Sequence, residues 1–181
     1  MQQLIAFLRG INGGVTVKMA DLRDAFEQIG FTQVKTVLAT GNVIFEATES
    51  DRAKVATRIE KMIANVFDYQ TSAIIMTPSE LRRLVANNPF GDLAADIQHA
   101  PQISFVKGGV KGSELTIPLD RSQKGYTLVG ASKQAVFSIL DLSGATRPDL
   151  LSVLDKAFGK NVTTRNWQTI KRVRDALEGT Y

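Results

Sequence analysis

The chain repeats one order of apolar patterns twice, and this repetition restricts its fold more than any other feature. Short apolar runs, typical of buried strands, alternate with stretches whose apolar residues recur at helical spacing. Hairpin patterns begin at residues 34 and 125 and closing helices at residues 78 and 166, so the two halves are offset by about ninety residues. We therefore predict an α+β fold of two ferredoxin-like βαββαβ units with additional helices. The first half would span residues 1–90, and the second, partly degenerate half residues 91–181, in one compact unit.

In the first half, the strand patterns are residues 4–8, 34–47 (a hairpin turning at 40–42) and 72–76. One helix carries Met19, Leu22, Phe26 and Ile29 at helical spacing, and the next carries Val55, Ile59, Met62, Ile63 and Val66. Ser50 is the expected cap of that second helix. Thr77, Pro78 and Glu80 predict a capping box at the start of a third.

The second half follows the same order with one omission. The expected elements are a strand at 102–106, a hairpin at 125–140 turning at 130–132, a helix at 147–159, a strand at 161–165 and a helix at 166–177. The segment 112–123 is too short to supply the first crossover helix and contains Pro118. We expect both halves to have the strand order 4-1-3-2, as separate sheets rather than one parallel sheet.

Composition places the chain among globular proteins. Hydrophobic residues make up 44% of the 181 residues and charged residues 22%, and no apolar run approaches the roughly 18 residues that span a bilayer. The chain has no cysteine, which excludes disulfides and thiolate metal sites. The apolar stretch near the N-terminus is too short for a signal peptide. We predict a cytoplasmic protein with no membrane association, no metal and no cofactor.

The positive charge is concentrated in the second half. Residues 1–100 contain 10 Lys and Arg against 11 Asp and Glu, whereas residues 101–181 contain 12 against 7. Such an imbalance is compatible with phosphate-bearing partners, but five charges spread over about eighty residues are more simply an ordinary solvated surface.

Several segments resemble one known family. They are "FLRGING", "KMADLRDAFEQIGF", "ATGNVIFEA", "NPF" and "TTRNWQTIKR", in that order along nearly the whole chain. By these segments the chain resembles the family of proteins of unknown function DUF1697. The resemblance implies a small bacterial cytosolic protein with an α+β fold and no established activity. The chain departs from the family pattern at "GATRPDL" (144–150), where a Gly-Ser-Lys-Leu type of segment is usual, and at Thr40, where serine is usual.

Two loops of the first half contain candidate ligand-binding residues. The loop after the first strand includes Arg9, Asn12 and Gly13 between a strand and a helix, where backbone N–H groups can hold a phosphate. Its glycine spacing matches neither dinucleotide-binding nor P-loop motifs, and a turn that requires positive φ is the simpler interpretation. The hairpin turn adds Thr40, Gly41 and Asn42 to these candidates.

Other candidates for chemistry are weak. His99 is the only histidine, and we expect it to be exposed in a connector. Asp21, Asp24 and Glu27 are typical of the solvated face of a helix. Phe7 and Phe45 occupy the strands that stack bases in RNA-recognition folds, but each lies in an apolar run typical of the core. The sequence contains no paired carboxylates or nucleophile arrangement that would indicate an enzyme.

The segment at 165–167 contains the remaining candidates. Asn166 is a suitable N-cap for the last helix, and Trp167 leads its apolar stripe, so we expect Trp167 to be mostly buried. A cation at a helix N-terminus is disfavoured by the helix dipole unless an anion compensates it. We therefore expect Arg165 to contact an anion, either an internal carboxylate or a bound ligand.

The sequence thus favours a non-enzymatic binding module for a small anionic or nucleotide-like ligand, or for nucleic acid. One alternative is an enzyme of unknown reaction that uses polar residues near the Arg9–Asn12 loop. Another is a structural or protein-interaction module with an exposed sheet edge. The sequence leaves the oligomeric state open.

Overall fold

The computed structural model describes residues 1–92, 99–110, 119–121, 124–143 and 149–180. The chain divides into two compact units, which are described separately below. Unit 1 comprises Met1–Arg83 together with Arg172–Tyr181, and unit 2 comprises Leu84–Lys171. The boundaries of these compact units differ from those of the predicted halves, 1–90 and 91–181. The division into two halves therefore stays a prediction.

Unit 1 contains a four-stranded antiparallel sheet. Its elements in chain order are β1 (Gln2–Leu8), α1 (Met19–Gln28), β2 (Thr32–Val37), β3 (Asn42–Ala47), α2 (Arg52–Phe67), β4 (Ala73–Met76) and the first part of α3 (Pro78–Asn87). The strand order is β2-β3-β1-β4, which is the predicted order. β1 is therefore a central strand, and its residues from Leu4 to Leu8 are all fully buried.

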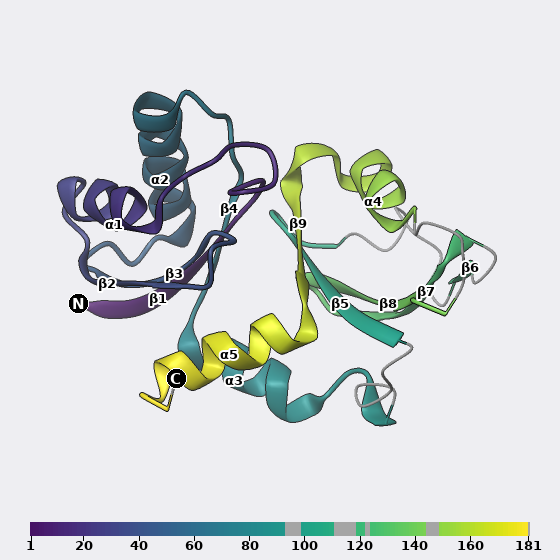
Figure 1. Cartoon of the computed structure of the whole chain (residues 1–181). Helices are drawn as coiled ribbons and strands as arrows, with labels where there is room; N and C mark the ends of the chain where they lie inside the picture. The colour runs from purple at the N-terminus through teal and green to yellow at the C-terminus, as the bar shows by residue number, and fades with distance from the viewer. Residues whose placement is uncertain (93–98, 111–118, 122–123, 144–148, 181) are drawn as a thin grey trace. The chain divides into compact units, whose positions relative to one another are not determined.

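Helices α1 and α2 lie against one face of this sheet (Figure 1). Because side chains alternate along a strand, Leu4, Ala6 and Leu8 share that face and pack against apolar side chains of both helices. Phe45 completes an aromatic group there, with ring centroids 5.4 Å from Phe26 and 4.6 Å from Phe31. Phe7 and Phe45 are both fully buried, so neither is an exposed platform for bases.

The helix starts of unit 1 agree only in part with expectation. Asp51, not Ser50, caps α2, because its carboxylate accepts hydrogen bonds from the N–H groups of Ala53 and Lys54. Asp and Ser are comparable caps, and the structure selects the residue next to the first helical turn. At α3 the predicted capping box is present: Thr77 N–H donates to Glu80 Oε2 and Glu80 N–H to Thr77 Oγ1.

Val66 was expected in the apolar stripe of α2 but is 51% exposed.

Unit 2 contains a five-stranded antiparallel sheet. Its elements in chain order are the rest of α3, β5 (His99–Val106), β6 (Leu119–Arg121), β7 (Tyr126–Ala131), β8 (Ala135–Asp141), α4 (Leu150–Phe158), a 3₁₀ turn (Gly159–Asn161), β9 (Val162–Asn166) and the start of α5 (Trp167–Leu177). The strand order is β6-β7-β8-β5-β9. The hairpin turn lies at Ser132–Gln134, slightly later than predicted.

Helix α4 lies on one face of the second sheet (Figure 1). Its buried residues Leu150, Leu154 and Phe158 pack with apolar residues of four strands, namely Val106, Tyr126, Leu128, Val136 and Val162. The alternate residues of β5, Ile103 and Phe105, point to the opposite face and are also fully buried.

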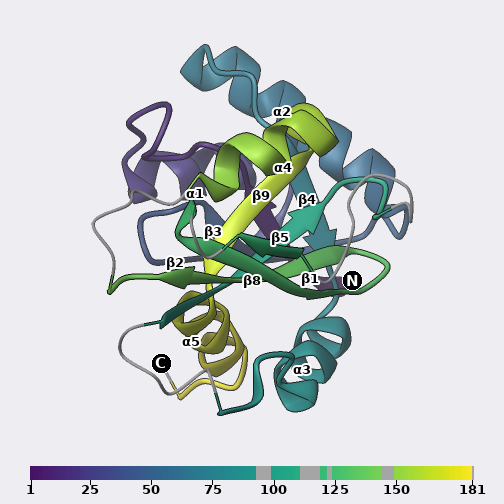
Figure 2. The same ribbon diagram turned by 90° about the vertical axis from the view of Figure 1, so that its right-hand side faces the viewer.

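The last part of α5 returns to unit 1. There it lies beside the first part of α3 (Figures 1 and 2), and Arg82 and Glu178 form an ion pair with a 3.7 Å separation. An ion pair this exposed contributes little to stability. Val173 and Ala176 of the same part of α5 are buried.

The chain therefore has an α+β fold with two antiparallel sheets and, in the described residues, five α-helices. The prediction of four strands in each sheet is wrong for unit 2, where β6 extends the edge. The four other strands, in the order β7-β8-β5-β9, have the same relation as those of unit 1. Most of the segment expected to lack a crossover helix lies outside the described residues, so duplication remains a prediction.

Candidate functional site

The candidate residues fall into two groups, one in each unit. Arg9, Asn12 and Gly13 lie with the hairpin-turn residues Thr40, Gly41 and Asn42 in unit 1, and Arg165, Asn166 and Trp167 lie in unit 2.

In the loop that follows β1, backbone N–H groups bond within the loop. The carbonyl oxygen of Gly10 accepts hydrogen bonds from the N–H groups of Gly13, Gly14 and Val15, at 3.1, 2.7 and 3.2 Å. The N–H of Asn12 donates to the carbonyl of Val15 at 2.7 Å. A phosphate-binding loop must direct such N–H groups at the ligand, whereas these have internal acceptors.

The side chain of Asn12 makes hydrogen bonds to backbone groups of its own loop and of the β2–β3 turn. Its Nδ2 donates to the carbonyl oxygens of Val17 (3.0 Å) and Ala39 (2.7 Å), and its Oδ1 accepts from Val17 N–H (2.7 Å). Both amide donors are thus occupied. The backbone of Asn12 has φ 55°, a conformation that asparagine tolerates better than most residues. Asn12 therefore joins the loop to the β2–β3 turn.

Tyr69 explains the glycines of this loop and was not among the predicted residues. A Cβ atom at Gly14 would lie 2.5 Å from Tyr69 Oη, and a Cβ atom at Gly10 would collide with the same hydroxyl. Gly13, by contrast, faces open space. Two glycines are thus required by close packing of a tyrosine that is distant in sequence, and no local signal indicates this contact.

The β2–β3 turn also has structural roles for its candidates. Gly41 leaves no room for a side chain, since a Cβ atom there would lie 2.9 Å from the Cβ of Ile11. Asn42 is fully buried, and its Nδ2 donates to the carbonyl of Val37 (2.9 Å) and to Thr40 Oγ1 (3.0 Å). Thr40 is exposed and Arg9 is half-buried, so these two keep side chains nearer the surface.

In unit 2, Asn166 and Trp167 have the structural roles predicted for them. Asn166 Oδ1 accepts a hydrogen bond from Gln168 N–H at 2.8 Å and so caps α5. Trp167 is 3% exposed, which confirms the predicted burial. Its ring packs edge-to-face on Phe90 at 5.4 Å, and Phe90 packs on Phe137 at 6.1 Å.

Arg165 is buried on strand β9, where it pairs with Ile103 of β5. It is 8% exposed, and Nη1 donates to Thr163 Oγ1 and to the carbonyl oxygen of Thr164, both at 2.8 Å. Burial lowers the pKa of Arg165 to about 10. The guanidinium therefore remains charged at neutral pH, in surroundings that disfavour its charge.

The remaining sequence candidates add no chemistry. Among the residues that the structure describes, no three His, Cys, Asp or Glu side chains are grouped as a metal site. His99 is half-buried at the first position of β5, not exposed in a connector as expected. Asp21, Asp24 and Glu27 are exposed on α1, as predicted.

In the described part of the chain, no helix has the length and apolar character needed to cross a bilayer.

Two antiparallel sheets with helices place the chain in the α+β class. The family model "Protein of unknown function (DUF1697)" matches residues 1–137, and the chain belongs to that family. Arg165, Asn166 and Trp167 lie beyond the matched residues.

A solved structure of similar fold is that of the conserved bacterial protein SP0830 from Streptococcus pneumoniae. It has 18% sequence identity to this chain and a TM-score of 0.66, and the match covers 98% of this chain and 99% of that one. The two proteins therefore have a similar fold over nearly the full length of both chains. No curated protein matches the chain.

Proposed function

We propose that the chain is a non-enzymatic binding module for a small anionic or nucleotide-like ligand, recognised by Arg165. The observation that carries this proposal is a charged guanidinium, 8% exposed, whose Nη1 donates to Thr163 Oγ1 and to the carbonyl oxygen of Thr164 on the same strand. Low-dielectric surroundings strengthen the attraction of such a buried cation to a bound anion.

The geometry around Arg165 limits the class of ligand. Strand β9 is paired with β5 from Gln102 to Val106, which fixes the backbone from which Arg165 extends. Thr163 Oγ1 and the Thr164 carbonyl orient its Nη1, and the planar guanidinium matches the geometry of phosphate and carboxylate groups. Because so little of the side chain is exposed, the group suits a compact anion rather than a polymer.

The competing functions have less support. An enzyme built on the Arg9–Asn12 loop would need free polar groups, but the amide donors of Asn12 and the N–H groups of Gly13 and Gly14 are occupied. An interaction module using the edge strand β2 would need a regular edge. The pairing of β2 shifts register between Thr32 and Lys35, and Gln33 has φ 51°, which is the kind of irregularity that protects an edge.

The test compares Arg165→Met with a control variant, Arg172→Met. Both variants lose one arginine charge, but Arg172 is exposed. Binding of inorganic phosphate and AMP would be measured by calorimetry and unfolding by urea denaturation. If Arg165 binds a ligand, Arg165→Met abolishes binding and leaves the free energy of unfolding unchanged or higher, since a buried charge is removed. Arg172→Met should leave both quantities unchanged.

An internal carboxylate partner predicts the opposite result. Breaking a buried pair leaves one charge uncompensated, and Arg165→Met would then destabilise the fold by about 3–5 kcal/mol. That outcome, or phosphate and AMP binding that persists in Arg165→Met, would refute the proposed ligand role of Arg165.

We also propose that the two sheets derive from a duplicated ferredoxin-like unit, with halves at 1–90 and 91–181. The matching strand orders β2-β3-β1-β4 and β7-β8-β5-β9 support this proposal. A cytoplasmic location is a further proposal, supported by a sequence without cysteine.

A further inference from the structure

The two helices that cover the sheet of unit 1 present opposite charges to solvent. The exposed charged side chains of α1 are all acidic, namely Asp21, Asp24 and Glu27. Those of α2 are all basic, namely Lys54, Arg58 and Lys61. Residues three or four positions apart lie on the same face of a helix, so each set forms a stripe along its helix. We call these sets the acidic stripe and the basic stripe.

The remaining charged side chains of the two helices are half-buried and have partners away from the stripes. Arg23 Nη1 donates to Thr36 Oγ1 at 3.1 Å, and Glu60 Oε1 accepts from a backbone N–H of β4 at 2.8 Å. Arg52 forms the ion pair with Glu80 at the start of α3. Neither stripe therefore contains an exposed charge of the opposite sign.

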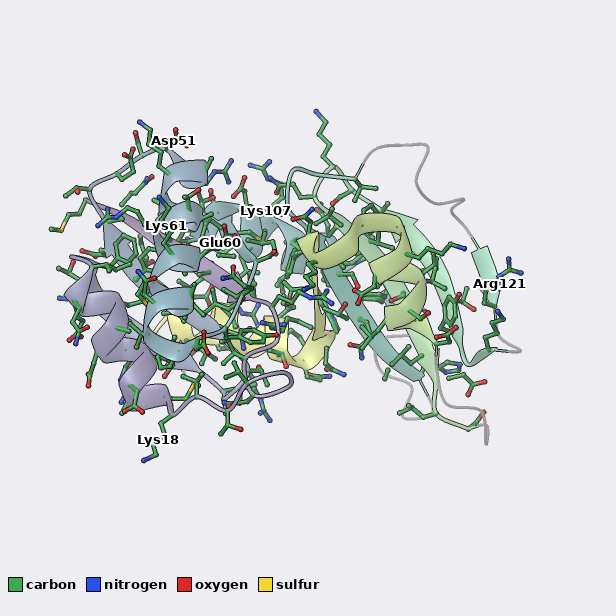
Figure 3. The ribbon with its side chains drawn as sticks, turned by 90° about the horizontal axis from the view of Figure 1, so that it is seen from above. Lys18, Asp51, Glu60, Lys61, Lys107 and Arg121 are labelled. Carbon is green, nitrogen blue, oxygen red and sulfur yellow. The ribbon has the colours of Figure 1, made fainter. Side chains whose placement is uncertain are left out.

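Helices α1 and α2 lie side by side and run in opposite directions. Figure 3 shows Lys18, which precedes α1, and Asp51, which precedes α2, at opposite edges of the helical face. Arg58 joins the two helices, because it donates to the carbonyl of Ile29 at the end of α1 and lies over the ring of Phe31, 4.9 Å from its centroid. The two stripes therefore belong to one surface.

Helix stability accounts for only part of this pattern. The dipole of α1 favours Asp21 in its first turn, but it disfavours Glu27 in its last turn. Lys54 is likewise disfavoured in the first turn of α2. Like charges three or four positions apart also repel one another along each helix. Lys54 and Lys61 have no ion-pair partner among the residues that the structure describes.

A surface that serves solubility alone usually intersperses both signs of charge. Here the signs are separated, one on each helix, and each stripe has three charges. Such a surface is complementary to itself, because turning it over brings each stripe opposite the other.

We propose that this surface pairs with the same surface of a second copy of the chain. A two-fold axis that runs between α1 and α2 and parallel to them places the acidic stripe of each copy over the basic stripe of the other. Lys18 and Asp68 are exposed beside the start of α1 and the end of α2, which lie at the same edge because the helices are antiparallel. In the pair, these two opposite charges also face each other.

The dimer is weak and sensitive to salt. Exposed ion pairs contribute little individually, and salt screens them. Charge complementarity selects the partner and its orientation more than it adds affinity. The proposal is independent of the small-anion proposal for Arg165, because both stripes belong to unit 1 and Arg165 to unit 2.

The experiment is sedimentation equilibrium of the full chain at about 0.1 M and about 1 M salt, between which the Debye length falls from about 10 Å to about 3 Å. The wild type should dimerise reversibly at the lower salt concentration and dissociate at the higher one. Lys54→Glu/Lys61→Glu reverses the net sign of the basic stripe, and Asp24→Lys/Glu27→Lys that of the acidic stripe. Each variant alone should dimerise at least about tenfold more weakly, because attractions become repulsions.

Mixing the two variants tests the pairing directly. An equimolar mixture should form heterodimers, since an acidic stripe again faces a basic one in both contacts. A chain with all four substitutions has the net charge of the wild type and should dimerise as the wild type does. The control for net charge is Lys133→Glu/Lys160→Glu, which reverses two exposed lysines of unit 2 and should leave dimerisation unchanged.

Four results would overturn the proposal: a wild type that stays monomeric at the lower salt concentration, a dimer that survives either reversal, variants that do not pair with each other, or an equal loss in the unit 2 control. Circular dichroism of each variant verifies that the fold is intact. The substituted side chains are all exposed, so the fold should tolerate the changes.

Discussion

The Nδ2 atom of Asn12 lies 2.7 Å from the carbonyl oxygen of Ala39, and this hydrogen bond joins the loop after β1 to the β2–β3 turn. With its bonds to Val17, the side chain satisfies three backbone groups that the loop would otherwise leave without protein partners.

We expect Asn12→Ala to destabilise the chain by about 1–3 kcal/mol, because backbone acceptors lose their partner and alanine disfavours positive φ. Asn12→Gly separates the two effects, since glycine tolerates φ 55° but makes no side-chain bond. Urea denaturation of the three proteins should give the order wild type, Asn12→Gly, Asn12→Ala. Equal stability of wild type and Asn12→Gly would show that the side-chain bonds contribute nothing.

Gly14→Ala should be destabilising because its Cβ atom would meet Tyr69 Oη at 2.5 Å. Gly13→Ala is the matched control, since a Cβ atom there meets nothing within 4 Å. Tyr69→Phe removes the hydroxyl and should recover part of the loss in Gly14→Ala/Tyr69→Phe, which a double-mutant cycle of unfolding free energies detects. Additive effects would contradict the steric explanation.

Glu80 should make stability depend on pH in the acidic range. Burial raises the pKa of Glu80, but hydrogen bonds from Thr77 N–H and Arg52 and the charge of Arg52 outweigh it, and the net pKa is lowered. The stabilisation is therefore present above the unfolded-state pKa of about 4.3 and is lost as pH falls through the lower folded-state pKa. Arg52 Nη1 lies 2.7 Å from Glu80 Oε2, and this pair is the main charge contact.

Glu80→Gln should therefore reduce stability at pH 7, and its difference from wild type should shrink at an acidic pH below the folded-state pKa of Glu80, where the wild-type carboxylate is also protonated. Glu27→Gln, on the exposed face of α1, is the control for the loss of one carboxylate and should leave the free energy of unfolding at pH 7 nearly unchanged. The measurement is the free energy of unfolding at both pH values. A constant difference between Glu80→Gln and wild type would exclude the ionised carboxylate as the cause.

Trp167→Ala should cost about 3–5 kcal/mol, because a large buried ring leaves a cavity beside Phe90. Trp167→Phe should cost less, since it keeps an aromatic edge against Phe90. Unfolding would be followed by circular dichroism, as Trp167 is the only tryptophan and its fluorescence is lost in both variants. A cost below 1 kcal/mol for Trp167→Ala would contradict its role as an anchor of α5.

Local patterns in the sequence determined the elements. Thr77, Pro78 and Glu80 lie within four residues, so the capping box could be predicted without knowing the fold. The same holds for the Asn166 cap and for the buried stripe that begins at Trp167. The strand order of unit 1 followed from the order of elements, because short connections and right-handed crossovers leave few topologies.

Tertiary structure alone decided what the candidate residues do. Gly10 and Gly14 are required by Tyr69, and Asn12 is held by Ala39; both contacts join residues far apart in sequence. Arg165 was expected at the end of a short strand, next to the N-terminus of the last helix, and only the pairing of that strand with Ile103 of β5 shows that it is buried. The physical reason is that caps and periodicity depend on neighbours along the chain, whereas burial, desolvation and clashes depend on which distant segments the fold brings together.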